Sequence, residues 1–354
     1  MDFITFVSMK EKKNILVTGG AGYIGSHTVV ALINKGFTPI IVDDFRNAKH
    51  SVLDALAQLT GEKILCYKIS CQDEQALLAV FNKHKIWGVI HFAADKSVEE
   101  SVHNPLKYFE NNLGGLISLL KVMKKKHVSR LVFSSSCTVY GTPEQAQVTE
   151  ESPVSYASPY GFTKLTNEQM LEQFCSAEKD FKTVLLRYFN PVGAHDSQLI
   201  GEEPAGIPSN LLPYLTQTAA GVRECLVVYG KDYQTKDGTC IRDYIHVMDL
   251  AEAHVAALNY MEKQNIPHLD VFNIGTGKGT SVQEMISCFE QHCQPSLNWK
   301  YGKRRAGDVP EIYANASKAA EKLNWQARFS IKDAIVSAWN FELKQRTKDT
   351  LQDE

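Results

Sequence analysis

The chain has 354 residues, of which 44% are hydrophobic and 22% are charged, and its formal net charge at pH 7 is -2. This length allows one large domain with a smaller second region, and the hydrophobic content excludes a largely disordered chain. The nearly neutral charge excludes a general attraction to nucleic acid or to an anionic membrane, so a phosphate site must be local.

Eight cysteines are spread along the chain with no C-x-x-C pair among them. This pattern favours reduced thiols in a cytoplasmic protein over a disulfide framework or a metal site, so no metal is expected. Residues 1–13 contain a short apolar stretch that no basic residue precedes and that is much shorter than a membrane span. We therefore expect an N-terminal extension there, and neither a secretion signal nor a membrane segment.

From residue 14 onward, apolar runs of strand length alternate with segments of helical period. We predict strands at 15–18, 39–42, 64–69, 88–92, 131–134 and 183–187. We predict helices at 23–35, 73–84, 105–126 and 159–178. Strictly alternating strands and helices indicate βαβ units, and the right-handed crossover rule then predicts an α/β fold with a Rossmann-type, doubly wound parallel sheet.

The pattern changes after residue 190, where a stretch broken by glycine and proline, 191–213, ends the alternation. We predict a nucleotide-binding Rossmann domain at 14–190 with some later segments contributing, and a smaller α+β region, mainly for substrate binding, at 191–345. Residues 346–354 are expected to be a tail. The smaller region should cover the C-terminal edge of the sheet, where doubly wound folds bind ligands.

A glycine motif follows the first predicted strand directly. Gly19, Gly22 and Gly25 form G-x-x-G-x-x-G between this strand and a helix, the context in which such a motif binds a dinucleotide pyrophosphate at a helix N-terminus. The second strand ends at Asp43, whose carboxylate would bind the adenosine ribose hydroxyls and repel a 2′-phosphate. NAD is therefore favoured over NADP, although Arg46 argues in the other direction and Asp43 has the alternative interpretation of a solvated turn residue.

Tyr160 and Lys164 lie four residues apart in a predicted helix that Pro159 opens, so their side chains share one face. We expect the cation to lower the pKa of the phenol, which makes Tyr160 a candidate general base, and to reach the nicotinamide ribose. Ser136 follows the preceding strand and is the candidate for binding the reacting oxygen. An exposed aromatic–cation pair and a plain strand-end serine are the alternatives, but the glycine motif upstream favours catalysis.

Six motifs resemble those of UDP-glucose 4-epimerases, and the resemblance covers residues 14 to about 339. They are VTGGAGYIGSH at 17–27, SSSCTVYG at 134–141, SPYGFTK at 158–164, LRYFNPVGAH at 186–195, RDYIHVMDLA at 242–251 and RRAGD at 304–308. The resemblance implies interconversion of UDP-glucose and UDP-galactose in galactose metabolism, through transient hydride transfer from sugar C4 to tightly held NAD with Tyr160 as base. It also implies a homodimer joined through 105–126 and 159–178.

The resemblance assigns further residues to the two ligands. Around NAD it places Tyr23, Ile24, Asp43, Asp44, Phe45, Asn47, Phe92, Ala93, Lys96, Asn111, Lys164 and Phe189. Around the UDP-sugar it places Ser136, Tyr160, Asn190, Asn210, Leu211, Arg242, Arg305, Asp308 and Ile312. Two arginines suit a diphosphate, and an aspartate suits ribose hydroxyls. Ile312 is smaller than the bulky aromatic residue that excludes a 2-N-acetyl group, so turnover of UDP-N-acetylglucosamine is expected.

The chain also departs from this family pattern. Ser70 and Cys71 replace an Asp-Ile pair near the adenine, and Asp95 occupies a position where an apolar residue is usual. The sequence GTGKG at 275–279 lacks the serine or threonine of a phosphate loop and is predicted to be a turn.

Three competing functions fit the same scaffold. A 4,6-dehydratase needs an added acid and base, and the Thr-Asp-Glu of that group is Ser136, Cys137 and Thr138 here. A decarboxylase that makes a UDP-pentose is the second alternative. A catalytically silent NAD-binding regulator is the third, and the intact set of Tyr160, Lys164 and Ser136 argues against it.

Overall fold

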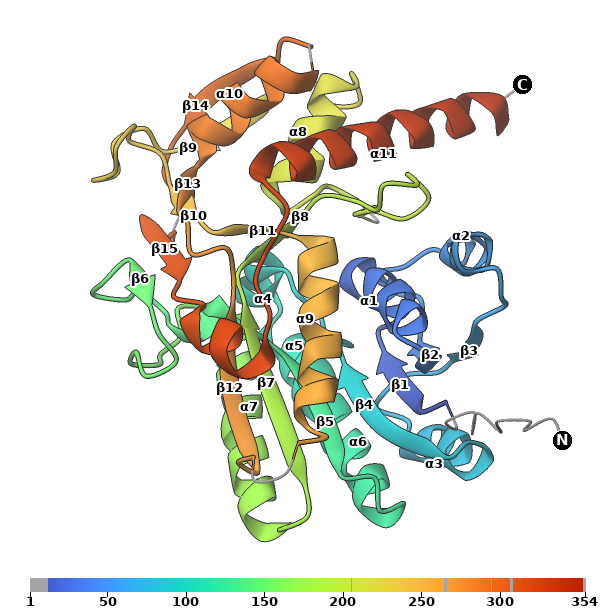
Figure 1. Ribbon diagram of the computed structural model, residues 1–354. Helices are drawn as coiled ribbons and strands as arrows, with labels where there is room; N and C mark the ends of the chain where they lie inside the picture. Colours follow the sequence, from blue (N-terminus) through green and yellow to red (C-terminus); the bar gives the residue numbers. More distant parts are fainter. Residues whose placement is uncertain (1–11, 205, 264–265, 294, 306–307, 353–354) are drawn as a thin grey trace, which may run out of the picture.

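A seven-stranded parallel sheet forms the centre of the computed structural model, in the order β12-β7-β5-β4-β1-β2-β3 (Figure 1). Its strands are β1 (Asn14–Thr18), β2 (Thr38–Asp43), β3 (Leu65–Lys68), β4 (Ile86–His91), β5 (Arg130–Ser136), β7 (Lys182–Tyr188) and β12 (Leu269–Ile274). The strand order reverses at β1, where β2 and β4 lie on opposite sides. The predicted doubly wound sheet is thus confirmed, and its switch point lies between β1 and β4.

Helices cover both faces of this sheet because successive strand residues point to opposite sides. The helices are α1 (Tyr23–Asn34), α2 (Ser51–Thr60), α3 (Glu74–Lys83), α4 (Val98–His103), α5 (Pro105–Tyr108), η1 (Phe109–Leu113), α6 (Gly114–Lys125), η2 (Cys137–Val139), α7 (Pro159–Ala177) and α9 (Val247–Tyr260). Ile15 and Val17 of β1 pack in one hydrophobic cluster with α1 and α9, whereas Leu16 packs in a second cluster with α3, α6 and α7.

The remaining elements form a smaller α+β region that gathers at one end of the molecule (Figure 1). β7 ends at the C-terminal edge of the large sheet, and β8 follows two residues later. The elements of the smaller region are β6 (Gln147–Val148), β8 (Asn190–Val192), α8 (Leu211–Ala219), β9 (Leu226–Tyr229), β10 (Ile241–Arg242), β11 (Tyr244–His246), β13 (Thr280–Ser281), α10 (Val282–Cys293), β14 (Trp299–Gly302), β15 (Glu311–Ala314) and α11 (Ile331–Gln352). The short helix η3 (Ala319–Leu323) instead packs in the cluster of the large sheet, beside α9.

The structure describes residues 12–204, 206–263, 266–293, 295–305 and 308–352, so most of the expected N-terminal extension, 1–13, lies outside it. Residues 346–352, which were expected to belong to a tail, continue the helix α11. The helix predicted at 105–126 is interrupted by the π-helix η1. Neither α2 nor α4 was predicted, and β12 joins the large sheet from far along the chain.

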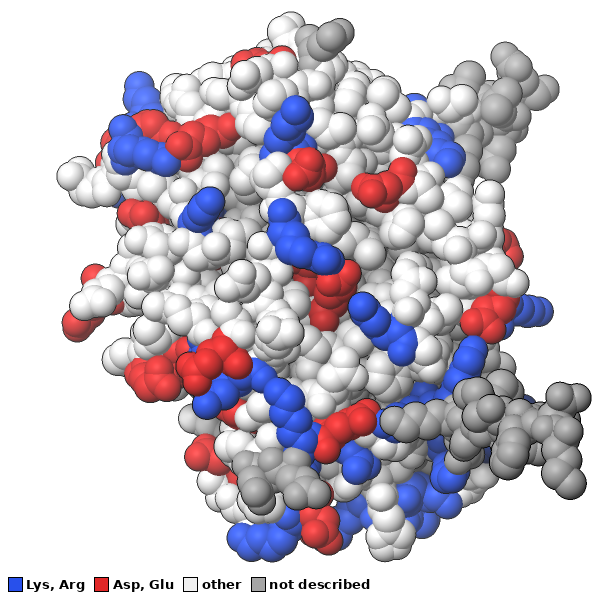
Figure 2. All heavy atoms as spheres, viewed as in Figure 1, with Lys and Arg blue, Asp and Glu red and all other residues white. Residues whose placement is uncertain are grey.

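No helix in the described part of the chain is long and apolar enough to cross a membrane. On the face that Figure 2 shows, acidic and basic side chains are interspersed. All eight cysteines lie in the described ranges and are free.

Candidate active site

The glycine loop after β1 leaves a cradle that side chains would fill. Gly19 has a φ of +69°, and a Cβ added there would lie 2.8 Å from the Ala93 nitrogen. A Cβ added at Gly25 would lie 2.2 Å from the Gly19 oxygen. Gly22 precedes Tyr23, the first residue of α1, so the backbone of the loop meets a helix N-terminus. This cradle fits the diphosphate of a dinucleotide, with the helix dipole favouring its charge.

Asp43, at the end of β2, is fixed against the same loop. Its carboxylate accepts hydrogen bonds from the backbone N–H of Ala21 at 3.0 Å and of Phe45 at 2.9 Å. Burial raises the pKa of Asp43, and these two hydrogen bonds act against that rise. Phe45 adopts a φ of 61° and stacks on His50 with ring centroids 3.9 Å apart. The carboxylate is therefore held beside the glycine cradle, as the adenosine end of NAD requires.

The other residues assigned to NAD lie along the same edge of the sheet. The Tyr23 hydroxyl donates to the Gly193 carbonyl at 2.6 Å, and Ala93 N–H donates to Thr18 Oγ1 at 3.5 Å. Phe92 packs against His254 with ring centroids 4.6 Å apart. Ile24 is half-buried, Asn47 is exposed and Phe189 is buried. Asp44 and Asn111 both contact Arg46, and the buried Cys71 packs in the hydrophobic cluster that contains Leu16.

Ser136, Tyr160 and Lys164 meet where β5 ends and α7 begins. Ser158 caps α7 by accepting from Gly161 N–H at 3.1 Å, and Pro159 occupies the first turn, so Tyr160 projects from the very start of the helix. The buried Lys164 Nζ donates to the Ser134 carbonyl at 2.6 Å and lies 5.8 Å from the centroid of the Tyr160 ring. The structure thus brings the three predicted catalytic side chains together.

Burial, and not the neighbouring cation, dominates the ionisation of this group. Burial raises the pKa of Tyr160 well above its usual value; Tyr188 acts in the same direction, and a hydrogen bond with Ser136 opposes it. Burial also lowers the pKa of Lys164 to about 8, which Glu168 partly opposes. The expected lowering of the phenol pKa by Lys164 is therefore not found, because desolvation penalises both charged forms.

A buried ionic network fixes α7 against the sheet. Glu168, one turn beyond Lys164, accepts from Arg187 Nη2 at 2.6 Å and from Arg187 Nε at 2.9 Å. Ser135 on β5 also donates to Glu168, and Tyr140 packs under the Arg187 guanidinium. Because the pair is nine-tenths buried or more and fully hydrogen-bonded, it specifies how Tyr160 and Lys164 are presented to β5.

Three residues assigned to the UDP-sugar converge in the smaller region. Asp308 accepts from Arg305 Nε at 3.1 Å and lies 4.0 Å from Arg242 Nη2. Arg242 on β10 is opposite Ile312 on the parallel strand β15. Ile312 is buried in a cluster with Val139, Tyr140 and Phe189, so this face of the small sheet adjoins the catalytic end of β5. Two guanidinium groups and a carboxylate suit a diphosphate attached to a ribose.

The turn at 275–279 wraps around the carboxylate of Asp243. Thr276 N–H donates to this carboxylate at 2.9 Å and Gly277 N–H at 3.0 Å. The prediction of a turn is confirmed, and its backbone donors are already used. Asn190, also assigned to the substrate, is connected to the same residue by a bond from its N–H to the Asp243 carbonyl at 3.0 Å.

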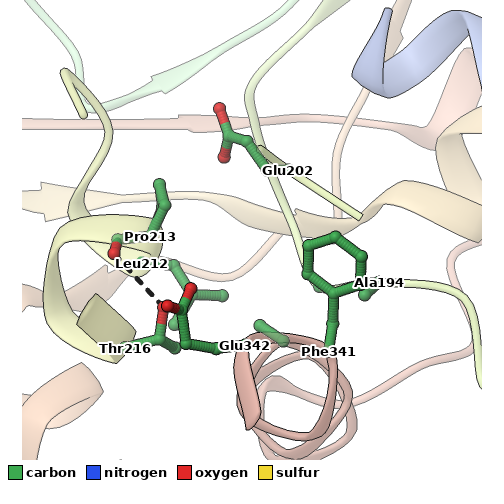
Figure 3. A pocket seen from close by; sticks show the side chains of 9 residues that line it. Ala194, Glu202, Leu212, Pro213, Thr216, Phe341 and Glu342 are labelled. Atoms are coloured by element: carbon green, nitrogen blue, oxygen red, sulfur yellow. Dashed lines mark hydrogen bonds between the residues drawn. The ribbon is translucent and has the colours of Figure 1, made fainter. Parts of the chain in front are cut away.

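Sequence reasoning did not identify Glu202, which joins residues assigned to different ligands. Its Oε1 accepts from Lys96 Nζ at 2.9 Å and from Asn210 Nδ2 at 2.6 Å. Asn210 directly precedes α8, which begins with Leu211. Figure 3 shows Glu202 at the edge of a small cavity between α8 and α11, with its carboxylate directed away from Phe341 and Glu342. A glutamate in a loop carries no local signal of such a role.

Comparisons with known proteins agree with this geometry. Residues 16–337 match the family model described as GDP-mannose 4,6 dehydratase. The UDP-glucose 4-epimerase 2 of Arabidopsis thaliana is 46% identical over 332 residues, which cover 93% of this chain and 95% of the relative. The UDP-glucose 4-epimerase of Bacillus subtilis is 45% identical over 328 residues, or 93% and 96% of the two chains.

A solved structure extends the comparison to the fold. The crystal structure of UDP-glucose 4-epimerase from Bifidobacterium longum in complex with NAD+ and UDP is 45% identical, with a TM-score of 0.91 over 94% of this chain and 99% of that one. The glycine cradle, Asp43 and the Tyr160–Lys164 pair define an enzyme of the NAD-dependent epimerase/dehydratase class. Within that class, the chain belongs to the UDP-glucose 4-epimerase family.

Proposed function

We propose that this enzyme interconverts UDP-glucose and UDP-galactose, with NAD as a bound cofactor and Tyr160 as the residue that moves the proton. The observation that carries the proposal is the meeting of Ser136, Tyr160 and Lys164 at the end of β5, between the glycine cradle and the group formed by Arg242, Arg305 and Asp308. The names of the relatives favour epimerisation over the dehydration named by the family model.

The chain's own residues have separate tasks in this reaction. Tyr160 takes the proton of the sugar 4-hydroxyl and later returns it, while Ser136 hydrogen-bonds the same oxygen. The glycine cradle and Asp43 would hold NAD, which would supply the acceptor and later the donor of the C4 hydride. Arg242 and Arg305 hold the diphosphate while the sugar turns, and Asp308 binds the uridine ribose. The positive charge of Lys164 stabilises the phenolate form of Tyr160, which is the form that accepts the proton.

Product analysis without added cofactor tests this proposal. Purified protein given UDP-glucose should yield UDP-galactose, and extraction of the denatured protein should release about one NAD per chain. A dehydratase would instead make a 4-keto-6-deoxy sugar, a decarboxylase would act only on a UDP-uronate, and a silent NAD-binding regulator would leave UDP-glucose unchanged. Any of these three results, or a protein that holds no dinucleotide, contradicts the proposal.

A homodimer through the helices at 105–126 and 159–178 is part of the proposal. Leu106 on α5 is 74% exposed, and Val102 on the adjacent α4 is 58% exposed. Ile117 on α6 and Tyr156, just before α7, are also exposed. Exposed apolar side chains gathered on one set of helices are typical of a protein interface. In sedimentation, the wild-type protein should be a dimer and Leu106→Lys should dissociate towards monomers. A wild-type protein that is already a monomer would exclude this interface.

We also place the protein in the cytoplasm. Its eight free cysteines, spread over strands, helices and loops, fit a compartment that keeps thiols reduced.

A further inference from the structure

Each guanidinium nitrogen of Arg46 has a protein partner, although the side chain is 39% exposed and stands where a doubly wound enzyme would bind the extra phosphate of NADP. It follows Asp43 by three residues, at the ribose end of the predicted NAD site, and an arginine near that carboxylate is the group that accommodates a 2′-phosphate. Asp44 engages both Nε, at 2.7 Å, and Nη2, at 2.6 Å. Asn111 Oδ1 accepts from Nη1 at 3.0 Å.

Asp95, in the segment that follows β4, lies on the other side of Arg46 Nη1. Its side chain is 2% exposed, and its Oδ2 lies 3.7 Å from Arg46 Nη1. This oxygen has no hydrogen-bond partner among the described residues. The backbone of Asp95 is fixed by Asn112, whose side chain accepts from Asp95 N–H at 2.9 Å and donates to the Asp95 carbonyl at 3.0 Å. The carboxylate is therefore a rigid, buried negative charge directed at Arg46.

We propose that Asp44 and Asp95 determine cofactor specificity by holding Arg46 away from a 2′-phosphate. Asp44 occupies the Nε–Nη2 fork, and Asn111 and Asp95 lie beside Nη1, so a phosphate would have to compete with these groups for the guanidinium. The carboxylates also repel an incoming dianion directly. Without this enclosure, an arginine beside the ribose would favour NADP and counteract the effect of Asp43. The inference depends on the NAD binding of the proposed function, but not on epimerisation.

Competitive cofactor uptake tests this specificity. The full chain is unfolded, refolded with equal concentrations of NAD and NADP, and the incorporated dinucleotides are extracted and counted. Wild-type protein should take up mainly NAD. Asp95→Asn keeps the shape but removes the negative charge beside Arg46 Nη1, and should raise the NADP-to-NAD ratio about tenfold because one ion pair is lost. Asp44→Asn should act in the same direction and serves as the second variant if Asp95→Asn does not refold.

Two further variants separate this role from a general loss of negative charge. In Arg46→Met the substitution Asp95→Asn should no longer raise the ratio, because the group that it releases is missing. Glu100→Gln removes a charge that pairs with Lys107, the other cation near Asp95, without touching Arg46, and should leave the ratio unchanged. An equal rise in the Arg46→Met background, an equal rise in Glu100→Gln, or no rise in Asp95→Asn and Asp44→Asn overturns the proposal. A wild-type chain that takes up neither dinucleotide overturns the proposed function as well.

Discussion

Tyr160 and Lys164 have pKa values that burial shifts in opposite directions. The pKa of the Tyr160 phenol rises and that of the Lys164 ammonium falls to about 8, so burial favours the neutral form of both groups. The sequence predicts which residues form this site but not these shifts. Helical spacing alone places the two side chains on one face, whereas desolvation depends on β5 and the helices packed around them.

Ile312 tests how the pocket selects its sugar. Its side chain is buried beside Phe189 and Tyr140, opposite Arg242. We expect Ile312→Tyr to lower the turnover of UDP-N-acetylglucosamine relative to UDP-glucose by about tenfold, because a bulky ring removes the space for the acetyl group at a cost of about 1–3 kcal/mol. The ratio of the two rates in one preparation cancels any loss of folded protein. If the substitution leaves that ratio unchanged, this position does not set specificity.

At the scale of elements, the strands were easier to predict from the sequence than the way in which they pair. The alternation of apolar runs placed six of the seven strands of the large sheet, because strands buried on both faces read as continuous apolar segments. β12 was missed because it joins the sheet beside β7 after the chain has passed through the smaller region. The six-residue α4 has only Ser101 buried, so it carries no apolar stripe to detect. The links made by Glu202 and Asp95 likewise arise only from tertiary contacts.

Two ion pairs attach the loop before α8 to the NAD-binding side, Glu202 with Lys96 and Glu203 with Lys49, and they should contribute unequally to ligand binding. Glu202 is 11% exposed and contacts both Lys96 and Asn210. Glu202→Gln keeps an acceptor for Asn210 but loses the pairing with Lys96. We expect UDP to bind about three- to tenfold more weakly in this variant, measured by calorimetry, because a charge-assisted hydrogen bond at the substrate loop becomes neutral.

Glu203 provides the matched control. It pairs with Lys49, whose side chain is 60% exposed, and exposed ion pairs contribute little. Glu203→Gln should therefore bind UDP like the wild-type protein. Equal affinities in the two variants would show that Glu202 has no special role in placing Asn210.

For the whole molecule, buried neutral histidines make the fold sensitive to acid. Burial lowers the pKa of His27 and His91 to about 3, and that of His246 and His254 to about 4. The unfolded chain takes up these protons near pH 6.5, while the folded chain does not do so until pH 4 to 3. Stability is therefore lost as the pH falls below 6.5, by at most about 5 kcal/mol per pH unit for four groups. Buried carboxyls with raised pKa values, such as Asp43 and Asp243, oppose this loss because the folded state protonates them first.

Urea unfolding at several pH values between 7.5 and 5 measures this slope. His254 donates from Nδ1 to the Leu250 carbonyl at 2.8 Å, a bond that an asparagine amide can replace. His254→Asn should reduce the slope by up to about 1.4 kcal/mol per pH unit, whatever it does to stability at pH 7.5, since one titrating group is gone. A slope that is the same in the wild-type protein and in His254→Asn would contradict this explanation.

The central claim is that Tyr160 moves the proton of the sugar 4-hydroxyl. The most direct measurement is single-turnover reduction of the bound NAD by UDP-galactose, followed at the NADH absorbance, in Tyr160→Phe with NAD content and UDP affinity matched to wild type. We predict that reduction slows by about 10²- to 10⁴-fold, because the ring still packs beside Tyr108 while the general base is missing. Reduction at a nearly normal rate would mean that another group removes the proton, and would contradict the mechanism.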